Sequence, residues 1–294
     1  MSVRELRADV ALEVQALLGE GPVWDDRDSS LLFVDIEGER VHRFDPSTGA
    51  HTSFATGAVV GSVGLRADGG LVLAMLGGFA LSGPSGEDLE PVAGFVADAT
   101  RVRFNDGEVD PWGRFVAGTM DWGKTEPLGE LYELSPDGSV TTLVTGVTIS
   151  NGLAWTPDHR TLYYVDTPTL GVDVFDVDPV DGTLSGRRRH LDIEEAEHGR
   201  PDGIALDVEG CLWVAFYGGS RVCRFTPDGQ LDTIVRLPAS CVTSVAFAGE
   251  DLDTLFVTTA RTDLEASARA GEPHAGDLFV VEPGTSGLSP ARFG

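Results

Sequence analysis

The sequence of 294 residues is poor in cysteine and in positive charge. Its three cysteines, Cys211, Cys223 and Cys241, include no C-x-x-C pair, and an odd number cannot all join in intramolecular disulfides. We therefore expect reduced, buried thiols and a cytoplasmic protein. The chain has only 21 Lys and Arg residues but 47 Asp and Glu residues, which gives a formal net charge of -26. No basic stripe is present to neutralise phosphates, which argues against nucleic acid and against anionic membrane surfaces as partners.

Long apolar runs and long helical periodicity are also missing. No run approaches the 18 apolar residues that suggest a membrane span, and the first twelve residues lack the apolar stretch of a signal peptide. Only two short segments, 192–197 and 263–270, have a helical pattern. The rest alternates apolar and polar residues over four to seven positions, interrupted by many of the 37 glycines and 16 prolines. This pattern predicts an all-β protein of short strands and tight turns.

The strands repeat as units of about 40–50 residues. Each unit has a glycine-containing motif, an Asp-rich turn, a strongly apolar strand, a third strand and a more polar fourth strand. Four units are clear, and two weaker ones lie at 61–95 and 243–282. Six four-stranded units predict a six-bladed β-propeller that occupies residues 1–294 as a single domain. We expect residues 11–14 to pair with the last unit and close the ring, whereas a large β-sandwich would leave the repeated order unexplained.

Four short motifs with acidic or amide side chains begin the clear units: Gly19-Glu20-Gly21-Pro22, Phe104-Asn105-Asp106-Gly107, Ser150-Asn151-Gly152 and Pro201-Asp202-Gly203. Successive motif residues are 85, 46 and 51 positions apart, so the first gap spans two units and the others one each. Because innermost propeller strands line the central axis, these side chains should meet at one mouth of the channel. Their oxygen atoms, without His or Cys, favour a hard cation such as Ca²⁺, Mg²⁺ or Mn²⁺ over Zn²⁺.

The alternative for each motif is an ordinary turn, because Asn-Gly and Asp-Gly are common turn dipeptides. Glu20 is harder to explain in that way, since nothing in Gly19–Pro22 needs a carboxylate. Arg103 should lie on the same side of its strand as Asn105, where it could hold a hydroxylated or anionic substrate. Its alternative is a structural salt bridge to a carboxylate of the same blade.

Other catalytic patterns are absent from the sequence. It contains neither G-x-S-x-G nor H-E-x-x-H. The acidic run 176–182 resembles an EF-hand loop, but Asp181 stands where that loop requires glycine, so a hairpin turn is expected. The basic run 187–190 is isolated, and we expect it on an outer strand.

The motifs together resemble the senescence-marker protein/gluconolactonase/luciferin-regenerating enzyme family, to which the regucalcins belong. The resemblance is carried by residues 18–22, by 103–111 with Gly118-Thr119-Met120, by 150–155, and by 200–203 with 212–215. It extends to 276–279 and so covers nearly the whole chain. It implies a propeller with one divalent cation on its axis, Ca²⁺ first and Mn²⁺, Mg²⁺ or Zn²⁺ as alternatives.

The resemblance also implies roles for individual residues. Glu20, Asn151 and Asp202 match the metal ligands, and Asp202 also matches the acid/base. Arg103 and Asn105 match positions that contact a sugar-like substrate. The sequence departs from the family after Gly-Thr-Met, because Gly123 stands where related proteins carry a substrate-contacting glutamate. Asp121 or Trp122 is the candidate to replace that glutamate at the substrate.

These residues predict a metal-dependent enzyme that hydrolyses sugar lactones to aldonic acids. The cation would polarise the lactone carbonyl and lower the pKa of a bound water, while Asp202 transfers the proton. Two alternatives use the same ligands: a non-catalytic Ca²⁺-binding propeller that acts through partners, and a hydrolase of other esters such as phosphotriesters.

Overall fold

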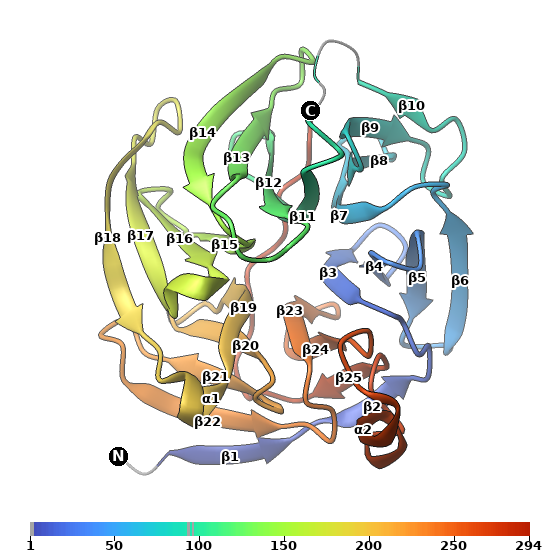
Figure 1. Cartoon of the computed structure of the whole chain (residues 1–294), viewed down its shortest axis with the longest axis vertical. Coiled ribbons are helices and arrows are strands. Elements are labelled where there is room, and N and C mark those ends of the chain that lie inside the picture. The colour runs from blue at the N-terminus through green and yellow to red at the C-terminus, as the bar shows by residue number, and fades with distance from the viewer. Residues whose placement is uncertain (1–2, 93–94, 96) are drawn as a thin grey trace.

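The computed structural model shows six β-sheets arranged as the blades of a propeller around a central channel, and it describes residues 3–92, 95 and 97–294 (Figure 1). Five blades follow directly in chain order, with their strands numbered from the inside outward. The all-β, six-bladed fold expected from the sequence is therefore confirmed.

The blades are built from the following strands. Blade 1 has β3 (Gly19–Asp25), β4 (Ser30–Asp35), β5 (Arg40–Asp45) and β6 (Ala50–Ala55). Blade 2 has β7 (Val60–Leu65), β8 (Leu71–Met75), β9 (Gly78–Ser82) and β10 (Glu90–Pro91). Blade 3 has β11 (Val102–Val109), β12 (Phe115–Asp121), β13 (Gly129–Leu134) and β14 (Val140–Val147). Blade 4 has β15 (Ser150–Trp155), β16 (Thr161–Asp166), β17 (Gly171–Val177) and β18 (Leu184–Asp192). Blade 5 has β19 (Arg200–Leu206), β20 (Leu212–Tyr217), β21 (Arg221–Phe225) and β22 (Leu231–Arg236). Blade 6 has β23 (Val242–Ala248), β24 (Thr254–Thr259) and β25 (Leu278–Val281).

The N-terminus closes the ring. Strand β2 (Asp9–Leu12) pairs antiparallel with β25 and supplies the fourth strand of blade 6. The expected pairing is therefore confirmed, although the strand ends at Leu12 rather than at residue 14. Strand β1 (Arg4–Arg7), which the sequence did not suggest, adds a fifth strand to blade 5 by pairing parallel with β22.

The hydrophobic core lies between adjacent blades. The second strand of each blade is buried on both faces, as in β4, where Leu31, Leu32, Phe33 and Val34 are all at most 1% exposed. Such continuous apolar strands pack between neighbouring sheets rather than against water on one face. One cluster joins Phe33 of blade 1 to Phe256 of blade 6, so the ring is sealed by packing as well as by strand pairing.

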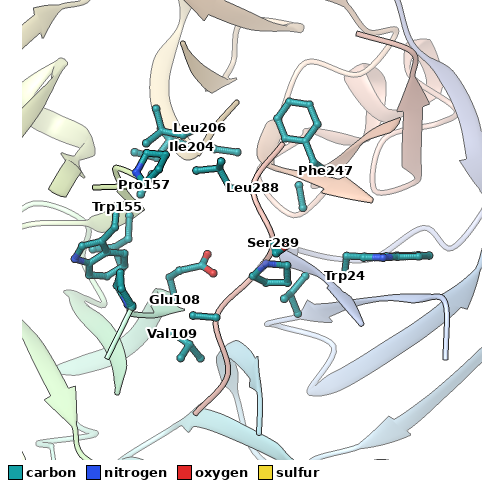
Figure 2. Close-up of a pocket in the computed structure, with 18 of the residues that line it drawn as sticks. Trp24, Glu108, Val109, Trp155, Pro157, Ile204, Leu206, Phe247, Leu288 and Ser289 are labelled. Carbon is teal, nitrogen blue, oxygen red and sulfur yellow. The ribbon is translucent and has the colours of Figure 1, made fainter. Parts of the chain in front are cut away.

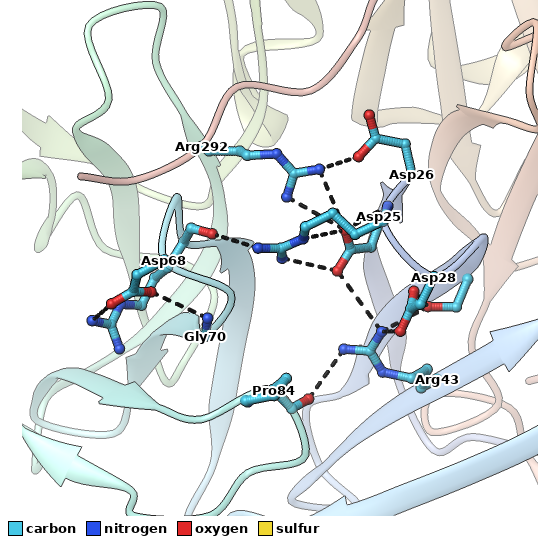
Figure 3. Close-up of polar contacts among 11 residues, drawn as sticks. Asp25, Asp26, Asp28, Arg43, Asp68, Gly70, Pro84 and Arg292 are labelled. Atoms are coloured by element: carbon cyan, nitrogen blue, oxygen red, sulfur yellow. Dashed lines mark hydrogen bonds and ion pairs between the residues drawn. The ribbon is translucent and has the colours of Figure 1, made fainter.

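The last residues of the chain cross one end of the channel, a feature that the strand repeat does not predict (Figure 1). Backbone hydrogen bonds tie this segment to four blades, through Val208, Leu252, Leu65 and Gly113. Arg292 then forms ion pairs with Asp25 and Asp26, and Arg27 binds the same Asp25 with an Nε–Oδ1 distance of 2.8 Å (Figure 3). The buried Asp25 carboxylate thus anchors the segment, and these arginines lower its pKa although burial alone would raise it.

Several smaller expectations are also confirmed. All three cysteines are free and buried. The two segments with a helical pattern overlap the short helices α1 (Glu195–His198) and α2 (Ala266–Gly271), each of which ends one residue beyond its segment. Thr167–Thr169 form a 3₁₀ turn, η1. The basic run 187–190 lies on β18, the outermost strand of its blade, and the acidic run 176–182 leads into the β17–β18 hairpin. Within the described part of the chain, no helix is long and apolar enough to cross a membrane.

Candidate active site

Four of the six innermost strands carry the candidate site near their first residues. Glu20, Asn105, Asn151 and Asp202 lie near the starts of β3, β11, β15 and β19, and all four are 4–5% exposed. Each of these four strands has a register shift at this position or directly after it, for example between Glu20 and Val23. A bulge of this kind bends the strand and re-aims its side chains, and bulges are frequent beside active sites. We call the channel end formed by these four residues the polar end.

The glycines of the motifs lie inside strands, so the turn interpretation of these dipeptides is wrong. Gly152 and Gly203 allow adjacent inner strands to approach closely. A Cβ atom on Gly152 would lie 2.7 Å from the backbone oxygen of Asp202, and one on Gly203 would lie 2.1 Å from Oγ of Ser244. Glycine is needed here because six strands converge on a narrow axis.

Hydrogen bonds link the polar side chains in a continuous series. Nη1 of Arg103 donates to Oδ1 of Asn105 (2.7 Å), and Nδ2 of Asn105 donates to Oδ1 of Asn151 (2.7 Å). Nδ2 of Asn151 donates to Oγ1 of Thr167 (2.7 Å), which itself donates to the carbonyl oxygen of Pro201 (2.8 Å). The series fixes the orientation of both amides, because each amide nitrogen has an acceptor. The placement of Arg103 beside Asn105, expected from strand alternation, is confirmed.

Three carboxyl groups lie near this series with little compensating charge. Burial, and then the neighbouring charges of Asp202 and Asp106, raise the pKa of Glu20 well above its usual range. Burial and Asp106 likewise raise the pKa of Asp202, and burial raises the pKa of Asp106 to about 6. Arg103 favours the charged forms of Glu20 and Asp202, but this is one of their weaker influences. One guanidinium therefore does not neutralise the three acids.

The residues present fit a divalent cation. Oδ1 of Asp202 is buried and has no hydrogen-bond partner among the described residues, which is costly for a carboxylate unless a ligand binds it. Two carboxylates and an amide oxygen with a fixed orientation would together offer oxygen donors of the kind that Ca²⁺ or Mn²⁺ prefers. No group of three His, Cys, Asp or Glu side chains arranged to hold a metal occurs in the described residues, so any metal bound here would need an amide oxygen beside the carboxylates.

The segment after β12 shows where the two substitutes for the family glutamate lie. The carboxylate of Asp121 accepts hydrogen bonds from the backbone nitrogens of Thr125 (3.2 Å) and Glu126 (3.1 Å), which lower its pKa and order the loop. Trp122 lies over the guanidinium of Arg103, 5.9 Å from ring centroid to Cζ, and is 44% exposed. Asp121 is thus engaged by its own loop, whereas Trp122 presents a free aromatic surface beside Arg103.

Two loops from opposite blades meet over the polar end. Lys124 follows the second strand of blade 3, Asp263 follows the second strand of blade 6, and their side chains form a salt bridge of 2.9 Å. The hydroxyl of Tyr217 from blade 5 also donates to Asp263 (2.8 Å). Both charged side chains are almost half exposed, so the contact is weak and salt-sensitive.

Three features of the site were not predicted from the sequence: the support of Asn151 by Thr167, the charge of Asp106 beside the other acids, and the salt bridge between the two loops. Thr167 follows the apolar strand β16, and nothing in the local sequence indicates that it lies under the side chain of a different strand. Asp106 was visible inside its motif, and its i+1 position beside Asn105 predicts the opposite face of a regular strand. The bulge between Phe104 and Gly107 interrupts that alternation.

Comparison with known proteins identifies the family. Residues 18–261 match the family model described as SMP-30/Gluconolactonase/LRE-like region. Regucalcin of Xenopus laevis is 40% identical over 283 residues, with 94% of each chain covered. The 6-deoxy-6-sulfogluconolactonase of Pseudomonas putida is 37% identical, with 95% of each covered. A crystal structure of a calcium-binding protein, regucalcin, from Agrobacterium tumefaciens superposes with a TM-score of 0.93 at 26% identity, covering 100% of this chain and 99% of that one. The chain belongs to the SMP-30/gluconolactonase/LRE-like family.

Proposed function

We propose that this protein is a lactonase that hydrolyses sugar lactones with the help of one divalent cation, Ca²⁺ in the first instance. The observation that carries the proposal is the buried, unpartnered Oδ1 of Asp202 in a cluster of acids at the polar end. Sugar lactonases occur among the relatives, including the sulfogluconolactonase, and the regucalcin structure is of a calcium-binding protein. Both properties are extended to this chain as part of the proposal.

The cation would be held by Glu20, Asn151 and Asp202. When bound, it would supply positive charge that polarises the lactone carbonyl and acidifies a water molecule. It would also keep Glu20 and Asp202 ionised, since a nearby positive charge opposes the effect of burial on their pKa. Asn105 and Thr167 do not need to touch the cation, because they hold the amide of Asn151 so that Oδ1 faces the site.

Asp202 would move the proton. Its carboxylate would accept a proton from the attacking water as the new C–O bond forms, and would return it to the ring oxygen as the ester C–O bond breaks. Each lactone molecule would then react with one water molecule to give one molecule of aldonic acid. A carboxylate beside a cation is a weak base, so Asp202 acts mainly by being correctly placed.

Arg103 and Trp122 would select the substrate. The hydrogen bonds of Arg103 within the described residues all come from Nη1, which leaves Nη2 and Nε available to hydroxyl groups of a sugar ring. Trp122 would offer its ring face to the C–H face of the sugar. Asp121 would contact the substrate, as predicted, only with those carboxylate lone pairs that do not already accept hydrogen bonds from its own loop.

The test is hydrolysis by metal-free protein to which Ca²⁺, Mn²⁺, Mg²⁺ or Zn²⁺ is returned singly. We expect cation-dependent acid release from at least one of glucono-, galactono- and xylonolactone, above the spontaneous rate. Turnover of a phosphotriester alone would assign the site to other esters. Calcium binding by calorimetry without turnover of any lactone would favour a non-catalytic binding protein. Glu250→Gln, a change at an exposed site, serves as a charge-matched control.

A further inference from the structure

The opposite end of the channel contains a cavity of about 410 Å³, within the range of small-molecule sites (Figure 2). The inner strands reach this end with Trp24, Val109, Trp155 and Leu206, so we call it the apolar end. The channel between the ends is lined by Asp106, Gly107 and Ser244 among others, and holds only about 20 Å³ of open space. The cavity is therefore a compartment separate from the candidate active site.

The cavity has aromatic and aliphatic walls and one acidic group. Trp24, Trp155, Phe247, Ile204 and Leu288 line it, and the carboxyl group of Glu108 points into it between them (Figure 2). Leu288 belongs to the C-terminal segment that crosses this end, whose neighbour Arg292 is anchored by Asp25 and Asp26. The cavity thus has a fixed wall on the side of the chain terminus.

Glu108 has no structural partner that explains it. None of the described residues donates a hydrogen bond to its carboxyl group or forms a salt bridge with it. Burial, and then the charge of Asp106, raise its pKa to about 8. Glu108 is only partly exposed, and a partly buried acid with no counterion costs stability, which suggests that a ligand completes this site. His159, Thr156 and Ser289 also line the cavity and can accept or donate hydrogen bonds at its edge.

We propose that the apolar end binds a small organic cation, with an ammonium group at Glu108 and an apolar body between the aromatic rings. Ring faces attract organic cations, and a carboxylate supplies the counterion. The net charge of -26 favours cations over anions throughout the molecule. A divalent metal ion suits the cavity less well, because Ca²⁺ needs six to eight oxygen ligands and Glu108 supplies the only carboxyl group among the described residues that line the cavity.

Binding of such a cation is coupled to a proton. Below pH 8 the acid of Glu108 is largely protonated, so an ammonium group must displace its proton. Affinity should then rise with pH by up to about tenfold per unit below pH 8, and level off above it. Asp106, whose charge acts on Glu108, and His159, which also lines the cavity, are the other titratable groups to consider. Asp106 titrates near pH 6, which leaves pH 7 to 8 as the cleanest window.

The experiment uses three probes with the same apolar body: 2-phenylethylamine, 2-phenylethanol and phenylacetate. Isothermal titration calorimetry of the full chain with saturating Ca²⁺ measures the affinity for each, in two buffers with different ionisation enthalpies. We expect the amine to bind at least about tenfold more tightly than the alcohol, with proton release approaching one per amine at pH 7. Phenylacetate should not bind. Amine affinity weaker than about 1 mM, or no better than that of the alcohol, overturns the proposal.

Two variants test whether the amine binds in this cavity. Glu108→Gln should lose the preference for the amine and the release of protons, while Glu250→Gln keeps both. Leu288→Trp should fill the cavity and weaken the amine and the alcohol alike. Unaltered amine binding in Glu108→Gln, with its fold confirmed by an unchanged circular dichroism spectrum, would show that the cation binds elsewhere and overturn the assignment. If Glu108→Gln fails to fold, unaltered amine binding in Leu288→Trp has the same consequence.

Discussion

The two ends of the channel are built by the same six strands and yet have opposite chemistry. At the polar end, Glu20, Asn151 and Asp202 crowd acids and amides around Arg103. Four positions later on the same strands, Trp24, Trp155 and Leu206 form an apolar compartment that contains one acid. The polar end is covered by a weak contact between two loops, whereas the C-terminal segment crosses the apolar end.

This difference shows how one repeated strand can present different chemistry at its two ends. The bulge after the first residues of each inner strand separates the two ends, because it interrupts the alternation that would carry one chemistry along the whole strand. Under the two proposals, the several acids at the polar end would bind a cation of charge two, and the single acid at the apolar end would bind a cation of charge one.

The largest effect is expected at Asp202. Asp202→Asn keeps the size of the side chain but removes a metal ligand charge and the proton acceptor, so lactone turnover should fall by about 10³-fold or more. Steady-state assays at saturating Ca²⁺ measure this fall. An unchanged melting temperature without Ca²⁺ would confirm that the fold is intact. Activity within about tenfold of the unaltered protein would remove Asp202 from the mechanism.

Glu20 offers the next largest effect, on stability rather than turnover. Calcium at about one hundred times its dissociation constant should raise the free energy of unfolding by about 2.7 kcal/mol, because it binds only the folded site. Glu20→Gln should lose most of this gain and, without Ca²⁺, should be at least as stable as the unaltered protein, since a buried acid with a raised pKa has been removed. Urea unfolding with and without Ca²⁺ measures both. Equal stabilisation of the two proteins would place the cation elsewhere.

The sequence was sufficient to predict those features of the fold and of the site that depend on periodicity. Alternating strands, repeated turns and motif spacing led to six blades, to closure by the N-terminus and to the side-by-side placement of Arg103 and Asn105. These features are local or repeat at a fixed interval. The assignment of individual ligands came from the family resemblance, and it remains a prediction until a cation is located.

Features that depend on contacts between non-repeating segments could not be predicted. The bulges change which side chains share a face, and a single sequence does not reveal them. The motif glycines therefore resemble turn residues in the sequence, although in the structure they allow strands to approach closely. Thr167 supports Asn151 from the turn η1, and the C-terminal segment completes a cavity built by residues distant in sequence. No sequence pattern within a single unit indicates such contacts between distant segments.

Thr167 tests how far the polar end depends on amide orientation. Thr167→Val removes the hydroxyl that accepts from Asn151 and donates to Pro201, while keeping the side-chain shape. Calcium affinity should fall by about 10–100-fold, as is typical when a residue that orients a metal ligand is lost. Thr167→Ser, which keeps the hydroxyl, should restore most of the affinity in a calcium titration. Equal losses in both variants would point to packing instead.

Glu108 distinguishes the apolar end by its pH dependence. Its pKa is raised to about 8 in the folded protein from an ordinary 4.5, so the folded state keeps a proton that the unfolded state loses. The stability contributed by this group is present below pH 4.5 and is lost as pH rises through 8, by at most about 1.4 kcal/mol per unit. Glu108→Gln should flatten this slope between pH 6.5 and 8 in urea unfolding with constant Ca²⁺. Parallel slopes in the two proteins would show that Glu108 is ionised there.

The smallest effect is expected at the bridge between the loops. Lys124→Ala breaks the salt bridge to Asp263 and should change the free energy of unfolding by no more than about 1 kcal/mol, because both side chains are almost half exposed. Its consequence should appear in the kinetics, since the bridge joins loops of opposite blades over the polar end. The KM for lactone should change with ionic strength in the unaltered protein, as salt screens the pair, and should lose that dependence in the variant. Lys124→Arg, which keeps the charge, should retain it. If the same salt dependence persists in Lys124→Ala, charges other than this pair control access to the polar end.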